Sequence, residues 1–195
     1  MFCTFFIIYF QEVSSQKKSN LVNRFSIEFG VNWIDSSGEQ NPLRFFKDYS
    51  NLAFSSPFKL ELDYLLNNSF ELYLSHSINK FSKNQLIDSY ILQESYSYSS
   101  TDLGLKYYIN KFNLFDINFS VFVHGGLGMF DVTKSGLSSN FGIGGVISIT
   151  NTLDFVVSSV AKFAVNHEFI NSNHFQYSVG IRIKLSNTES CYCPY

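Results

Sequence analysis

The sequence is poor in charge, in proline and in alanine. Charged residues make up 15% of the 195-residue chain, below the roughly 25% of an average soluble domain, and the formal net charge is −2. This balance gives no electrostatic reason to expect a nucleic-acid partner. Proline occurs three times, and alanine, the best helix former, is nearly absent. The shortage of alanine argues against a mainly helical protein.

Long apolar runs are also missing, so the sequence offers no helix of the roughly 20 residues that cross a bilayer. The apolar run at 2–10 has nine residues and is followed by the polar residues Ser14, Ser15 and Gln16. We interpret 1–16 as a secretory signal peptide, followed by a short N-terminal segment at 17–22. An ordinary apolar N-terminal strand is the alternative.

Cysteine is scarce as well, with three residues in the chain. Cys3 would leave with the signal peptide, and Cys191 and Cys193 lie in the last ten residues, 186–195, which we expect to form a periplasmic tail. These two are too close in sequence for an unstrained mutual disulfide. Three alternatives remain for them: a disulfide bridge to a partner, binding of a soft metal, or no particular role.

Aromatic residues, in contrast, are abundant. They make up 18% of the chain, with 22 Phe and 12 Tyr, and Ile, Val, Ser and Asn are also common. This mixture favours β-strands, and the length suits one domain. Eight segments alternate large apolar residues with small or charged ones at a period of two, as strands with two different faces do. They are 24–35, 57–66, 69–81, 100–109, 117–130, 140–149, 153–165 and 174–185.

An even number of eight strands is the smallest closed transmembrane barrel, so residues 23–185 are predicted to form an all-β, eight-stranded antiparallel up-and-down transmembrane β-barrel. The connections support this prediction. Short ones at 110–116, 150–152 and Asn67–Asn68, where the two asparagines predict a two-residue hairpin with positive φ, alternate with longer ones at 35–56, 80–97, 131–139 and 166–173. Outer-membrane barrels have short periplasmic turns and longer extracellular loops in this way.

The alternative is a soluble sandwich or a lipocalin-like barrel, in which the apolar face would point inward. Small residues argue against it. Gly30, Gly104, Gly126 and Gly180 lie in the polar phase, and small residues are expected on the face that lines the narrow interior of an eight-stranded barrel. Charges keep to the same phase, and the exception is Lys80 at one strand end. The predicted lumen carries five acids and five bases: Glu28, Glu61, Asp63, Glu71, Asp102, Lys59, Lys106, Lys162, Arg182 and Lys184.

The stretches "SNLAFSSPFKLELDYLLNNSFEL", "TDLGLKYYIN" and "HFQYSVGIRIKL" resemble the small OmpA-like eight-stranded barrels of Bacteroidetes-type outer membranes. The resemblance extends from about residue 23 to 185. It implies an integral protein of the outer membrane of a Gram-negative bacterium, surrounded by outer-membrane lipid. Many relatives continue into a peptidoglycan-binding domain, and this chain departs from them by stopping ten residues after the last strand.

We expect the lumen charges to pair as an ion network that plugs the barrel, with Arg182 and Lys184 of the last strand among its bases and Glu28 of the neighbouring first strand among its acids. The protein would then act structurally, or anchor other envelope proteins through loop 35–56 or the Cys191/Cys193 tail. A small-solute permeation barrel is the second hypothesis. An outer-membrane enzyme with His167 or His174 as a general base at the rim is the third. The sequence indicates no cofactor and no metal, and we expect no enzymatic activity.

Overall fold

The computed structural model describes residues 24–36, 52–87, 90–114, 117–165 and 173–185, and side chains within these ranges except those of 110–118. The described residues contain ten strands. They are β1 (Phe25–Asp35), β2 (Phe58–Leu65), β3 (Phe70–Phe81), β4 (Leu86–Ile87), β5 (Tyr90–Ile91), β6 (Tyr96–Leu114), β7 (Ile117–Asp131), β8 (Ser135–Ser148), β9 (Leu153–Ala164) and β10 (His174–Leu185). No helix in this part of the chain is long and apolar enough to cross a membrane.

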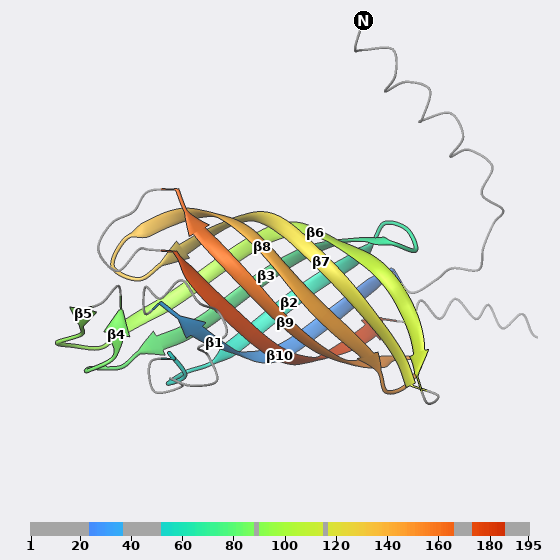
Figure 1. Ribbon diagram of the computed structural model, residues 1–195, viewed down its shortest axis with the longest axis horizontal. Coiled ribbons are helices and arrows are strands. Elements are labelled where there is room, and N and C mark those ends of the chain that lie inside the picture. The colour runs from blue at the N-terminus through green and yellow to red at the C-terminus, as the bar shows by residue number, and fades with distance from the viewer. Residues whose placement is uncertain (1–23, 37–51, 88–89, 115–116, 166–172, 186–195) are drawn as a thin grey trace, which may run out of the picture.

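Eight of these strands close into a barrel in the order β1-β10-β9-β8-β7-β6-β3-β2, and every neighbouring pair is antiparallel. The strands cross the barrel obliquely, and the β4–β5 hairpin lies beyond one end of it (Figure 1). Each barrel strand pairs with its neighbours in sequence, and β10 pairs back to β1. The predicted eight-stranded up-and-down antiparallel barrel is therefore confirmed.

The two faces of the barrel strands follow the predicted alternation. On β3, accessibility changes at every residue, so that Leu74 is 48% exposed on the outer wall and the preceding Tyr73 is 3% exposed inside. Large apolar side chains on every barrel strand are exposed in this way, including Phe29, Leu62, Leu105 and Ile143. The outer wall is thus apolar, and the polar phase of the sequence fills the lumen.

We call the end of the barrel where β2 meets β3 the turn end. Leu66 and Asn67 both donate backbone N–H groups to the Phe70 carbonyl, and the Asn67 side chain accepts from Ser69 and Phe70. Neither asparagine of the predicted two-residue hairpin has a positive φ. Among the described non-glycine residues, only Asn84 has one, at 70°. The expected hairpin type is therefore wrong, because the Asn67 side chain caps a longer turn.

The connection between β8 and β9 repeats this arrangement with a hydroxyl in place of the amide. Ile149 and Thr150 donate to the Leu153 carbonyl, and Thr150 Oγ1 accepts from the N–H groups of Thr152 and Leu153. The two turns lie at the same end of the barrel. A single polar side chain at the first turn position is enough to close each of them.

The opposite end, the loop end, differs from the sequence prediction in one connection. The predicted long loop 131–139 is wrong, because β7 continues to Asp131 and β8 begins at Ser135, which leaves a three-residue hairpin. The serines at 135, 138 and 139 make the alternation of apolar and polar residues too weak to predict the first part of this strand. In the structure, Leu137 points outward and Ser138 points inward. At the turn end, β6 and β7 likewise extend through most of the predicted connection 110–116.

The strands approach closely where glycines face each other across neighbouring strands. Gly30 on β1 lies opposite Gly180 on β10, and Gly104 on β6 lies opposite Gly126 on β7. A Cβ at Gly126 would lie 2.3 Å from the Leu103 carbonyl oxygen, and one at Gly104 would lie 2.3 Å from the Gly125 carbonyl oxygen. These glycines therefore allow a curvature that any larger residue would obstruct.

An apolar cluster covers the lumen at the loop end. Its buried members come from strands and from loop residues: Ile34, Ala53, Phe81, Ile87, Leu92, Tyr98, Phe130 and Ala164. Ile34 and Ala53 form a β-bridge, and the Asn79 side chain donates to the carbonyls of Asn32 and Ala53 at 2.9 and 3.0 Å. Loop segments thus fold back over the barrel, and we call this cluster the loop-end cap.

The strands of the barrel begin at Phe25 and end at Leu185. Most of loop 35–56 and most of 166–173 lie outside the described residues. The segments 1–16, 17–22 and 186–195, with Cys191 and Cys193, lie outside them as well. The signal peptide and the periplasmic tail stay predictions.

Candidate functional site

All ten charged residues predicted for the lumen lie inside the barrel. Nine of them are buried, with at most 6% of each residue exposed. The tenth is Lys184 at the turn end, whose side chain is 29% exposed. Their positions follow from the period-two pattern, because each occupies the inward phase of β1, β2, β3, β6, β9 or β10. The structure divides them into two groups, which the sequence did not distinguish.

The larger group is centred on Lys106 of β6. Its ammonium group lies 2.6 Å from Glu61 Oε1, 2.7 Å from Asp63 Oδ1 and 3.3 Å from Glu71 Oε1. It also lies over the Phe122 ring, 5.3 Å from the centroid. One ammonium thus binds carboxylates from β3, which is the neighbour of β6, and from β2, which is the next strand around the barrel.

Lys59 of β2 extends this group towards β1. Its Nζ lies 2.7 Å from Glu28 Oε1 and 3.1 Å from Glu61 Oε2. Glu61 therefore bridges Lys59 and Lys106, with one carboxylate oxygen on each ammonium. This chain of alternating charges connects β1, β2 and β6 through side chains alone.

Arg182 of β10 closes the group from the far side. Its guanidinium binds Asp154 Oδ2 through Nε at 3.0 Å and Nη2 at 2.7 Å, and Glu71 Oε1 through Nη1 at 3.2 Å. Nη1 also donates to the Tyr108 hydroxyl at 2.8 Å, and Lys184 Nζ lies 2.7 Å from Asp154 Oδ1.

Glu28 is part of the network, but it is not the partner of Arg182 or Lys184. Glu28 does lie opposite Arg182 in the β1–β10 register, but its carboxylate binds Lys59 instead. Asp154 of β9 forms ion pairs with both basic residues, although it was not among the predicted lumen charges. Its inward phase, eight residues before Lys162, was the available signal.

The second group lies nearer the loop end and is a single pair. Lys162 Nζ lies 2.7 Å from Asp102 Oδ2, and the Ser100 hydroxyl contacts both partners. Asn140 donates to Asp102 Oδ1 at 2.8 Å and accepts from Ser138. The buried charges are therefore surrounded by polar groups, as a stable buried pair requires.

Three carboxylates in the larger group come close enough for a metal. Glu28, Glu61 and Asp63 each place one oxygen within 4.8 Å of the others. Two ammonium groups, Lys59 and Lys106, bind these same residues and supply the positive charge that a cation would otherwise bring. The arrangement is that of an ion-pair network holding six strands together.

The three histidines in the described part of the chain, His76, His124 and His174, are not grouped at the rim. His174 is buried, where its Nε2 lies 2.8 Å from the Tyr98 hydroxyl and its ring packs on Phe130 at 5.0 Å. It begins β10 at the loop end, which is the rim position that was expected, but its side chain points inward because the inward phase of β10 begins at this residue. His124 faces the lumen, where its ring lies between Tyr73 and Phe122. His167 lies outside the described residues.

The outer wall carries more charge than the sequence indicated. Lys80 is exposed at the loop end of β3, as predicted, but Asp35 and Asp131 also take the outward phase at the loop ends of β1 and β7. All three lie at strand ends, and the described wall between the two ends of the barrel carries no charged side chain. One polar pair lies within it, His76 Nδ1 and Thr101 Oγ1, 2.9 Å apart.

Comparison with solved structures identifies the fold. The N-terminal β-barrel domain of OprF from Pseudomonas aeruginosa aligns with 81% of this chain and 96% of its own, at 13% identity and a TM-score of 0.53. Neisserial surface protein A aligns with 86% of this chain and 100% of its own, at 11% identity and a TM-score of 0.54. No family model and no curated protein sequence matches the chain.

Proposed function

We propose that this protein is an integral outer-membrane β-barrel of a Gram-negative bacterium, of the OmpA-like type, with a plugged and charge-paired lumen. The observation that carries the proposal is the distribution of polarity between its two surfaces. Ten buried charged residues of the described barrel line the inside, whereas exposed Leu, Ile and Phe side chains cover the outside. A soluble barrel would place these two sets the other way round.

The energetics of each surface support lipid as the surrounding solvent. Outward side chains such as Leu127, Phe141 and Leu103 are 70%, 62% and 53% exposed, which makes a continuous apolar surface unusual for a soluble monomer. A Lys or Arg facing lipid at mid-membrane costs about 2–4 kcal/mol. The restriction of Lys80, Asp35 and Asp131 to strand ends keeps charge out of that region.

The closed lumen favours a structural or anchoring role over permeation. A solute would have to displace the loop-end cap and then separate the ion pairs centred on Lys106 and Arg182. We therefore propose a non-enzymatic protein that holds partner proteins of the envelope through its extracellular loops, above all 35–56, or through the Cys191/Cys193 tail.

Membrane fractionation and gel mobility test the proposal together. Expressed in a Gram-negative host, the protein should sediment with the outer membrane. Unheated samples should migrate differently from heated ones, because a folded barrel resists detergent. Recovery in the soluble fraction without a heat-dependent shift would contradict the proposal.

The anchoring role needs a separate measurement. Envelope proteins recovered with the full chain in mild detergent are compared with those recovered with a variant in which residues 37–51 are replaced by a Gly/Ser linker. A partner specific to loop 35–56 should be lost while the gel shift persists. An identical set of proteins from both would contradict a role for this loop.

A further inference from the structure

One region of the outer wall breaks the apolar pattern, at the loop end of β3, β6 and β7. The outward residues of β6 are Leu103 and Leu105 in the middle of the strand, but Thr101, Ser99 and Ser97 towards the loop end. Three small hydroxyl side chains therefore follow one another along a surface on which most other outward side chains are large and apolar.

The neighbouring strands turn this row of hydroxyls into a depression. Ile78 and Asp131 lie opposite Ser99 from β3 and β7, and Lys80 lies opposite Ser97. Since neighbouring strands are about 4.8 Å apart, the larger side chains of β3 and β7 stand roughly 10 Å from each other across β6. The result is a pocket of about 380 Å³, whose walls include Lys80 on one side and Asp131 with Val132 on the other.

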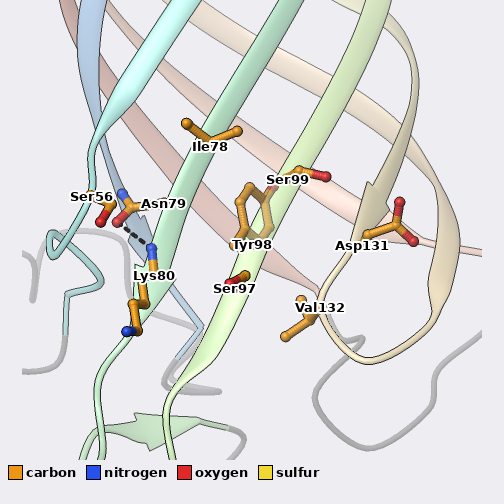
Figure 2. Close-up of a pocket in the computed structure, with 9 residues that line it drawn as sticks. All are labelled: Ser56, Ile78, Asn79, Lys80, Ser97, Tyr98, Ser99, Asp131 and Val132. Carbon is orange, nitrogen blue, oxygen red and sulfur yellow. Dashed lines mark hydrogen bonds between the residues drawn. The ribbon is translucent and has the colours of Figure 1, made fainter.

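Figure 2 shows this arrangement, with Ser97 and Ser99 on β6 between Lys80 and Asp131. We call this pocket, with Thr101 at its inner end, the β6 furrow. Thr101 is bonded to His76, which fixes that end. Asp131 accepts a hydrogen bond from the Ser135 hydroxyl, which orients its carboxylate at the other side.

The charges of the furrow are complementary to a zwitterion. Lys80 offers an ammonium group to an anion, Asp131 offers a carboxylate to a cation, and the hydroxyls between them can donate or accept hydrogen bonds. A simple anion would be attracted by Lys80 and repelled by Asp131. A group that carries both a phosphate and a primary ammonium meets each wall with the opposite charge.

The surface below the furrow selects a lipid over a soluble molecule of the same chemistry. Leu103 lies opposite Leu127 of β7, and the two are 53% and 70% exposed, with Met129 at 49% beside them. These side chains continue directly from the hydroxyl row towards the middle of the barrel. Acyl chains can lie on this surface while their headgroup occupies the polar end.

We propose that the β6 furrow binds a membrane lipid whose headgroup carries a phosphate and a primary ammonium group, with the phosphate at Lys80 and the ammonium at Asp131. The inference rests on the proposed membrane-spanning barrel, since it requires that lipid surrounds this wall.

Native mass spectrometry of the folded full-length barrel tests the inference. The protein is held in non-ionic detergent containing equal amounts of phosphatidylethanolamine, phosphatidylglycerol and phosphatidylcholine, and the lipids retained are counted. The unaltered protein should retain phosphatidylethanolamine preferentially. Lys80→Ala should lower this retention about five-fold, since a lysine near lipid phosphates contributes about 1 kcal/mol.

Asp131→Asn should remove the preference for phosphatidylethanolamine over phosphatidylglycerol without lowering total retention. Ser99→Leu should fill the furrow and abolish the preference. Two matched controls should behave like the unaltered protein: Lys83→Ala, an exposed lysine in the loop after β3, and Ser139→Leu, an outward serine on β8 opposite Leu127.

Equal retention of the three lipids by the unaltered protein would overturn the inference, and so would an effect of Lys83→Ala as large as that of Lys80→Ala. In either case a normal heat-dependent gel shift would still support the proposed barrel. Absence of the gel shift in the unaltered protein would instead contradict the proposed function, and the furrow with it.

Discussion

Lys106 shows at the scale of one residue why the lumen charges depend on each other. Its ammonium contacts three carboxylates, and the residue is 2% exposed. Replacing it by Met should leave the buried Asp63 carboxylate without its cation and remove one of the two cations that contact each of Glu61 and Glu71, which costs about 3–5 kcal/mol of folding free energy. Urea unfolding in lipid vesicles measures the loss. Lys83→Met is the control, because Lys83 is exposed. Equal stability of the two variants would contradict the network.

The Lys162–Asp102 pair permits a test of coupling, because it is separate from the larger group. Lys162→Met should destabilise the barrel, since the Asp102 carboxylate stays buried with only the neutral donors of Ser100 and Asn140. Adding Asp102→Asn should recover about 1–3 kcal/mol of that loss, as a double-mutant cycle in the same unfolding assay would measure. Strictly additive losses would mean that the two charges do not stabilise each other.

At the scale of the strand, adjacent glycines on β7 give a matched pair of substitutions. Gly126→Val should obstruct the approach of β6, because its Cβ would lie 2.3 Å from the Leu103 carbonyl oxygen and 2.8 Å from Gly104 Cα. Gly125→Val points outward, where the nearest atom to a Cβ is the Phe141 ring at 3.6 Å. The fraction of heat-shifted protein after refolding should fall for Gly126→Val and not for Gly125→Val. Equal folded fractions would show that the close approach is not required.

The period-two pattern predicted the strand faces because it is a local property of each segment. It placed Leu74 outside and Tyr73 inside, and it put all ten chosen charges in the lumen. The sequence did not indicate which of those charges pair with each other. Arg182 binds Asp154 and Glu71 rather than Glu28, since closure of the barrel brings β3 and β10 within reach of a long side chain.

The ends of the strands were the least predictable part of the fold. The β7–β8 hairpin was hidden by serines, which give a weak alternation and also suit loops. The loop-end cap depends on residues such as Ala53, Ile87 and Leu92, which become buried only when separate loops fold back over the barrel. The buried position of His174 has the same cause, since its partners Tyr98 and Phe130 come from β6 and β7.

At the scale of the whole molecule, the lumen is closed twice, by the loop-end cap and by the ion network. Replacing residues 86–91 by a Gly/Ser linker removes the β4–β5 hairpin and part of the cap, but leaves the network around Lys106 intact. Planar bilayers containing this variant, or the unaltered protein, should show no steady conductance steps. Large, stable steps from the unaltered protein would contradict a plugged lumen and support permeation.

The central claim is that the apolar wall faces lipid and the charged wall does not. In a Trp33→Phe background, a single tryptophan is placed by Leu74→Trp on the outer wall or by Tyr73→Trp on the inner one, at neighbouring residues. The barrel is then refolded into vesicles whose acyl chains carry bromine, a contact quencher. Fluorescence should be strongly quenched for Leu74→Trp and little changed for Tyr73→Trp. Quenching of neither residue, or of Tyr73→Trp more than Leu74→Trp, would contradict the account.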